Sequence, residues 1–90
     1  MNFSKKIKFS DAVLGQEVDG EMVLLDMNSE VYFGLDVVAT DIWKLLQGGK
    51  SLQETYEELL KIYDVKPEIL HKDLENFIED LLDHKLIKLA

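Results

Sequence analysis

The 90-residue sequence predicts an α+β fold of the winged helix-turn-helix type, with a small three-stranded antiparallel sheet followed by three helices. Three observations support this prediction. The longer strand-like apolar runs lie in the first 35 residues, helical periodicity begins at residue 36, and capping signals mark where later helices begin. A chain of this length holds one hydrophobic core, so we expect a single domain over residues 1–90.

Short apolar runs predict the strands. Ile7–Phe9 has the length of an edge strand, and Glu21–Met27 is apolar on both faces, which is typical of a strand buried on both sides. Asn28-Ser29 then separates this run from Glu30–Leu35, so the two runs are expected to form a β-hairpin. Asn-Ser is weaker turn chemistry than Asn-Gly, which favours a loop longer than two residues. Leu86–Leu89 is either a last strand or a docked coil.

Three helices are predicted from residue 36 onward. Asp36 is a suitable N-cap for the first, and Gly48-Gly49 ends it because glycine tolerates the left-handed conformation found there. Ser51–Glu54 is a capping box that begins the second helix. Pro67 suits the first turn of the third helix, which ends near His84. The apolar positions Trp43, Leu45 and Leu46 are assigned to the core.

Composition excludes several classes of protein. Cysteine is absent, which excludes disulfides and thiolate metal sites, and no apolar run approaches the ~20 residues of a membrane-spanning helix. The lysine-bearing start has no apolar segment behind it, so it is not a secretory signal. We therefore expect a cytoplasmic protein that does not bind membranes.

The net charge of −8 is unevenly distributed. Residues 1–10 carry three lysines and no acid, whereas residues 11–36 carry seven acids and no lysine. An acidic stretch repels phosphate polyanions and anionic lipids and suits a basic peptide or a basic protein surface. The other interpretation is that the acidic residues only provide solubility.

Catalytic and metal-binding patterns are weak. The carboxylates occupy helix-surface positions, and no serine lies in a G-x-S-x-G turn. His71 with Glu75, and Asp80 with His84, form two separate pairs, whereas a zinc site needs three or four ligands. We therefore expect no enzyme activity, no cofactor and no metal.

The helix-turn-helix outline makes a winged-helix DNA-binding transcriptional regulator the alternative function. Charge disfavours it, because a recognition helix needs cations to contact phosphates. The predicted third helix has two lysines, Lys72 and Lys85, against six acids: Glu68, Asp73, Glu75, Glu79, Asp80 and Asp83. We therefore expect no binding to nucleic acid.

Peptide binding at a sheet edge is the third option. If the strands form a meander, Glu30–Leu35 is an outer strand with one row of unpaired backbone groups, to which a peptide can add as a further strand. Gly34 allows close approach of another chain, and Tyr32 offers an apolar ring with a polar tip. The alternative is that Tyr32 is an ordinary half-exposed tyrosine and Gly34 a bulge before the helix.

The order and spacing of several short segments resemble the PqqD-like family, the recognition elements for precursor peptides of ribosomal natural products. The resemblance covers about residues 7–89. Two departures are Asp36, where the family often has Asn, and Ala39, where it usually has Gly; both keep the cap role and the small size. The segments that carry the resemblance are Asp19–Asp26, Val31–Asp36, Ile42–Leu46 with Gly48, Ser51–Glu54, Tyr63–Val65, Asp73 and Leu86-Ile87.

This resemblance implies a non-catalytic protein that binds the leader segment of a precursor peptide as an added strand and delivers it to a modifying enzyme. That partner is a radical SAM enzyme in coenzyme PQQ synthesis, or a leader peptidase and a cyclase in lasso peptide synthesis. Carried onto this sequence, the resemblance implies that the third strand and the margin of the third helix contact the leader. The expected contacts are Val31, Tyr32, Phe33, Gly34, Leu35, Asp73, Asn76, Phe77 and Asp80.

Overall fold

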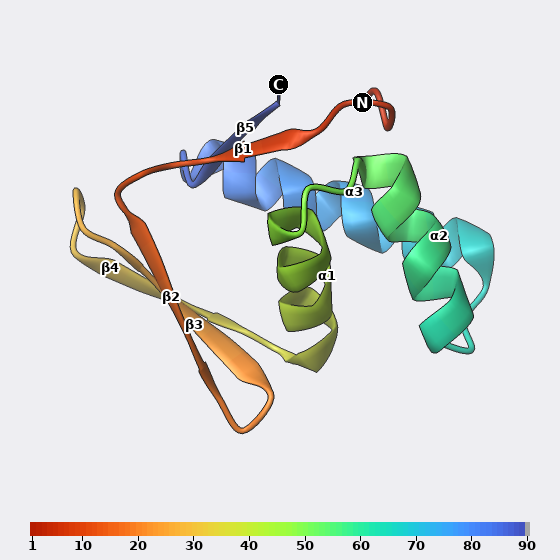
Figure 1. Cartoon of the computed structure of the whole chain (residues 1–90), viewed down its shortest axis with the longest axis horizontal. Coiled ribbons are helices and arrows are strands. Elements are labelled where there is room, and N and C mark those ends of the chain that lie inside the picture. Colours follow the sequence, from red (N-terminus) through yellow and green to blue (C-terminus); the bar gives the residue numbers. More distant parts are fainter. Residues whose placement is uncertain (90) are drawn as a thin grey trace.

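The computed structural model describes residues 1–89. It shows a three-stranded sheet at one end of the molecule and the helices at the other, with a separate pair of short strands, Ile7–Phe9 and Ile87–Leu89, beside the last helix (Figure 1). A three-stranded antiparallel sheet followed by three helices confirms the predicted α+β class. Within these residues the elements are β1 (Ile7–Phe9), β2 (Val13–Val18), β3 (Glu21–Asp26), β4 (Val31–Leu35), α1 (Val37–Gln47), α2 (Leu52–Ile62), α3 (Pro67–Asp83) and β5 (Ile87–Leu89).

The main sheet is a meander in the order β2-β3-β4. Asp19 and Gly20, both with positive φ (52° and 84°), make a two-residue turn between β2 and β3, which matches the twist of a tight hairpin. Residues 27–30 connect β3 to β4, so this loop is longer than two residues, as its Asn-Ser chemistry predicts. Glu30 closes the loop in the left-handed region, with φ 61°.

The prediction was wrong about which strands make up this sheet. Val13–Val18 was not predicted as a strand, and Ile7–Phe9 pairs instead with Ile87–Leu89 in a separate two-stranded ribbon. Five of the six β2 residues are exposed, so this strand lacks the apolar alternation of a half-buried one. The pairing of β1 with β5 joins the two ends of the chain, a long-range contact that local patterns do not reveal.

The two-sided burial expected for β3 is also wrong. Met22 and Leu24 are buried, but Val23 on the opposite face is 37% exposed. The helices cover one face of the sheet only (Figure 1), so the apolar residues of the other face remain at the surface.

The predicted helix starts are confirmed. The Asp36 carboxylate accepts the Ala39 N–H at 2.8 Å and so caps α1. Ser51 and Glu54 form a complete capping box, in which the Ser51 hydroxyl accepts the Glu54 N–H and the Glu54 carboxylate accepts the Ser51 N–H. Pro67 is the first residue of α3.

The core lies between the covered face of the sheet and the three helices. The predicted core residues Trp43 and Leu46 are both 2% exposed, and Leu45 packs against the core from its margin. The other fully enclosed apolar side chains come from α2, α3, β3 and the turn after α3: Leu24, Leu52, Leu59, Leu74, Ile78 and Leu86.

Candidate functional site

The outer edge of β4 has no strand partner within residues 1–89. The direction of its backbone groups follows from the turn between β2 and β3. Val18 and Glu21 flank a two-residue turn, where the flanking residues form a hydrogen-bonded pair, so Glu21 directs its N–H and C=O toward β2. Met22, the next residue, directs its groups to the opposite side, where its N–H donates to Thr40 Oγ1 at 2.8 Å.

This alternation continues along β3 and assigns the backbone groups of β4. Val31, Phe33 and Leu35 stand opposite the β3 residues whose backbone groups face β4, so their own N–H and C=O groups point toward β3. At the end of this pairing the Thr40 hydroxyl accepts the Met22 N–H and donates to the Leu35 carbonyl. The N–H and C=O groups of Tyr32 and Gly34 therefore point away from β3. These two residues supply the hydrogen-bonding row that a further strand would meet.

A groove lies along this edge, between β4 and the C-terminal half of α3, with a volume of about 270 Å³. Its floor is apolar, and three polar side chains stand among its walls. The lining residues are Phe33, Gly34, Leu35, Asp36, Ala39, Phe77, Asp80, Leu81, His84 and Leu86.

The turn after α3 builds one end of the groove. The Leu86 N–H donates to Leu81 O and the Lys85 N–H donates to Leu82 O, both at 3.0 Å, which is the Schellman arrangement of a helix end. This turn brings Leu86, which is 1% exposed, back against Leu81. The helix end and the turn after it therefore form part of the groove wall.

His84 connects the helix to the strand. Its ring contacts Phe33 edge-on with centroids 4.9 Å apart, and its Nδ1 lies 2.8 Å from the Asp80 carbonyl oxygen. Asp36 and Asp80 line the same groove, and their carboxylates make its wall acidic. An apolar floor beside an acidic wall suits an extended peptide that carries apolar side chains and, close to them, a basic one.

The structure brings together five of the nine residues predicted to contact a peptide: Phe33, Gly34, Leu35, Phe77 and Asp80 line the groove. Val31 lines an adjoining depression that shares Phe33 and His84 with the groove.

The remaining three predicted contacts lie elsewhere. The Tyr32 side chain is 69% exposed and lies on the uncovered face of the sheet beside Leu14 and Val23, so only its backbone faces the edge. Asp73 and Asn76 are exposed on α3 and do not line the groove.

Sequence reasoning did not assign five of the lining residues to the site: Asp36, Ala39, Leu81, His84 and Leu86. Asp36 was recognised only as a cap, and Leu81 only as part of an apolar helical stripe. The small side chain of Ala39 in the first turn of α1 was an available signal, because a small residue there leaves space beside β4. Nothing local predicts that Leu86 folds back onto the helix.

Within residues 1–89 no three His, Cys, Asp or Glu side chains are grouped so that they could hold a metal ion. In the same residues, every helix is too short or too polar to cross a bilayer.

Comparison with known proteins gives a family and a set of similar structures. The family model described as coenzyme PQQ synthesis protein D (PqqD) matches residues 21–87. The structure of TbiB1 in complex with the TbiA(beta) leader peptide is similar over 90% of this chain and 94% of that chain, with 37% identity and a TM-score of 0.86.

A second structure, a lasso peptide synthetase B1 complexed with the leader peptide, matches 92% of this chain and 98% of that chain. Its identity is 23% and its TM-score 0.84, which establishes a shared fold. Among curated protein sequences no match was found.

Proposed function

The chain belongs to the PqqD family, and on that premise we propose that it binds the leader segment of a ribosomally made precursor peptide as a strand added to β4. The observation that carries the proposal is the outer edge of β4, which no strand of residues 1–89 covers and which lies above an apolar groove. A relative with 37% identity, TbiB1, has been solved with a leader peptide, which supports the same use of this chain.

In this proposal the two kinds of contact have different tasks. Backbone hydrogen bonds to Tyr32 and Gly34 hold any extended segment, and side chains that enter between Phe33 and Phe77 select the sequence. Asp80, with Asp36, favours a basic leader residue at the wall. Asp73 and Asn76, farther back along α3, are proposed to contact leader residues that extend beyond the groove, and Val31 those at the start of β4.

We propose a binding role without chemistry of its own, in which the chain presents the leader to a modifying enzyme. The family resemblance suggests a radical SAM enzyme, or a leader peptidase with a cyclase, as that partner. The genes beside this one would distinguish the two pathways, because each pathway pairs its short precursor gene with different enzymes. Binding of micromolar affinity or tighter is expected.

Amide hydrogen exchange with the leader peptide of the neighbouring precursor gene tests this proposal. Added-strand binding protects the amides of Tyr32 and Gly34, which face away from the sheet, and changes those of Phe33 and Leu35 little. Isothermal titration on the same sample gives the affinity. The absence of both heat and amide protection would contradict leader binding.

A charge reversal tests the acidic wall. Asp80→Lys should weaken a basic leader and leave the fold intact, because this side chain is exposed on α3. Glu79→Lys, which makes the same charge change at an exposed neighbouring position outside the groove, is the matched control. Equal effects of the two substitutions would show that only the net charge matters.

A further inference from the structure

The groove continues into two more depressions along the side of the molecule. The groove shares Phe33 and His84 with the depression beside Val31, and that depression shares Asn28 and Lys85 with a third cavity of about 360 Å³. A strand added to β4 and extended past Val31 would therefore enter this third cavity.

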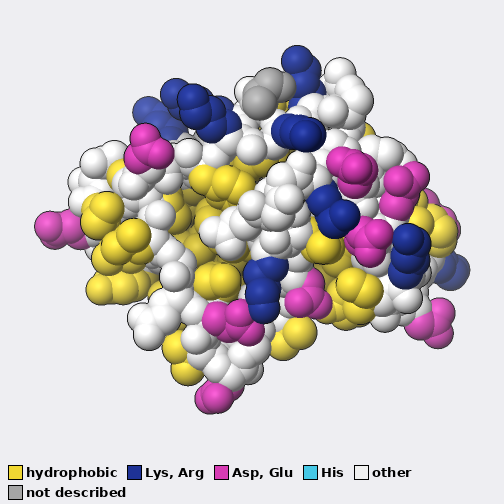
Figure 2. Space-filling model, viewed as in Figure 1, with side chains coloured by type: hydrophobic (Ala, Val, Ile, Leu, Met, Phe, Trp, Pro, Cys, Tyr) yellow, Lys and Arg dark blue, Asp and Glu magenta, His cyan; other side chains and the backbone are white. Residues whose placement is uncertain are grey.

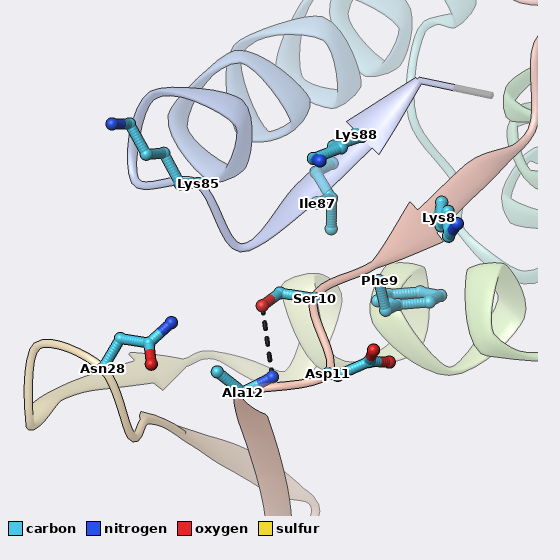
Figure 3. Close-up of a pocket in the computed structure, with 9 residues that line it drawn as sticks. All are labelled: Lys8, Phe9, Ser10, Asp11, Ala12, Asn28, Lys85, Ile87 and Lys88. Atoms are coloured by element: carbon cyan, nitrogen blue, oxygen red, sulfur yellow. Dashed lines mark hydrogen bonds between the residues drawn. The ribbon is translucent and has the colours of Figure 1, made fainter.

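The third cavity is lined by cations. Figure 3 shows it between the β3–β4 loop, the linker after β1 and the α3–β5 turn. Its lining includes Lys8, Lys85 and Lys88, with the Lys85 side chain directed outward from the helix end, and Asp11 is the acid among the lining residues. The chain as a whole has a net charge of −8. Lysines nonetheless gather over β1 and β5 in the space-filling view, at the upper margin of Figure 2.

The placement of these lysines is unfavourable for the protein alone. Lys8 and Lys88 are direct partners across the β1–β5 pair, and like charges in that position destabilise a sheet. Lys85 has φ 60° at the helix-end position where glycine is preferred, so its side chain adds backbone strain. A bound carboxylate would offset the repulsion between Lys8 and Lys88. It would also give the Lys85 side chain a partner of opposite charge.

We propose that this lysine-lined cavity binds acidic residues of the same peptide that adds to β4, an inference that depends on the proposed function. The peptide is then charged oppositely at its two ends, with basic residues beside Asp36 and Asp80 and acidic residues beside Lys85 and Lys88. Continuity of the three depressions favours this peptide over a separate acidic macromolecule as the occupant.

The first test selects binders from a displayed library of randomised twelve-residue peptides, with the full chain as bait. Enrichment of acidic residues on one side of an apolar segment, and of basic residues on the other, is the expected result. Their order also reports whether the peptide runs antiparallel or parallel to β4. Binders that lack the acidic bias would overturn the inference and leave the proposed function standing, whereas a library without any binder would count against both.

The second test measures selected peptides against variants. Lys85→Gly removes a cation and relaxes the helix end, so it should preserve or raise the melting temperature while it weakens acidic-flanked peptides about 3-fold. Lys85→Gly with Lys88→Gln should weaken them about 10-fold and leave the same peptides with Gln in place of the acids unaffected.

Lys72→Gln is the matched control, because it removes one charge at an exposed position of α3 outside all three depressions. It should change affinity little. If the control weakens acidic-flanked peptides as much as Lys85→Gly does, the effect belongs to net charge and the inference is wrong.

Discussion

Thr40 shows how a single residue positions the outer edge of β4. It is 1% exposed, and its hydroxyl accepts the Met22 N–H at 2.8 Å and lies 3.4 Å from the Leu35 carbonyl oxygen. One side chain of α1 thus contacts the start of β3 and the end of β4. The groove depends on this link because Leu35 and Ala39, on either side of it, both line the groove.

Replacing Thr40 with Val tests the link. The substitution keeps the volume but leaves the Met22 N–H without its acceptor, so we expect a loss of about 1–3 kcal/mol in the free energy of unfolding. Urea denaturation measures it. Thr40→Ser, which keeps the hydroxyl, should cost less than the valine variant, and the reverse order would show that packing of the methyl group is what matters.

Proline substitutions at two adjacent residues test the assignment of backbone direction in β4. Tyr32→Pro removes an N–H that faces away from the sheet, a site where strands accept proline, so the protein should stay folded but lose peptide binding. Phe33→Pro removes an N–H used inside the sheet and should destabilise the fold itself. Circular dichroism and isothermal titration separate the two outcomes, and a Tyr32→Pro variant that still binds would contradict strand addition.

At the scale of elements, local chemistry predicted every helix start. The predicted roles are confirmed: Asp36 and Ser51 cap α1 and α2, and Pro67 begins α3. They could be predicted because a helix start depends on residues within one turn. The Tyr63 hydroxyl, beyond the end of α2, also donates to Asp41 on α1, and this hydrogen bond raises the pKa of Tyr63 to about 12. Local sequence patterns do not predict a hydrogen bond between residues 22 positions apart.

The same limit explains which parts of the site were predicted. The outer position of β4 follows from the predicted meander, whereas Phe77 and Asp80 were expected only through the family resemblance, at the margin of the apolar stripe of α3. Leu86 and His84 reach the groove only through the Schellman turn, and β2 forms because β3 offers it an edge. Strand order and chain reversals are properties of the folded whole, so the sequence alone left them open.

The capping box of α2 gives a prediction on pH. Hydrogen bonds from the Ser51 backbone N–H, and then the Ser51 side chain, lower the pKa of Glu54. A carboxylate with a lowered folded-state pKa stabilises the protein above its ordinary pKa, and this stabilisation disappears as the pH falls through the folded-state pKa.

Glu54→Gln isolates this effect, because glutamine keeps an acceptor for the Ser51 N–H without the charge. The wild-type protein should be more stable than the variant at neutral pH, and the difference should vanish in acid. Thermal unfolding between pH 7 and pH 3 measures it. A difference that persists unchanged at the acid end would assign the effect to packing rather than charge.

At the scale of the whole molecule, charge and topology favour the same partner. The acidic side chains that line the groove beside β4 are Asp36 and Asp80, and α3 carries six acids against one lysine, so a DNA backbone would be repelled by this helix. Neither the family match nor the similar structures support the alternative of a winged-helix DNA-binding regulator.

Thermal stability with and without ligand tests the whole arrangement at once. A ligand that binds only the folded state at a concentration about 100-fold above its Kd adds about 2.7 kcal/mol to the free energy of unfolding. For a domain of 90 residues this corresponds to a rise in Tm of about 10–20 °C. The leader peptide should produce this rise in calorimetry, because a fourth strand would fix β4 against α3.

Two controls accompany this measurement. In the first, duplex DNA replaces the leader peptide; in the second, the leader peptide is added to the Tyr32→Pro variant. Neither should shift the Tm, since the first is repelled by the acidic surface and the second lacks a backbone donor at the edge. A rise in Tm with DNA would support the alternative function of a DNA-binding regulator. A full shift with the proline variant would place the peptide somewhere other than β4, and the groove would then need another occupant.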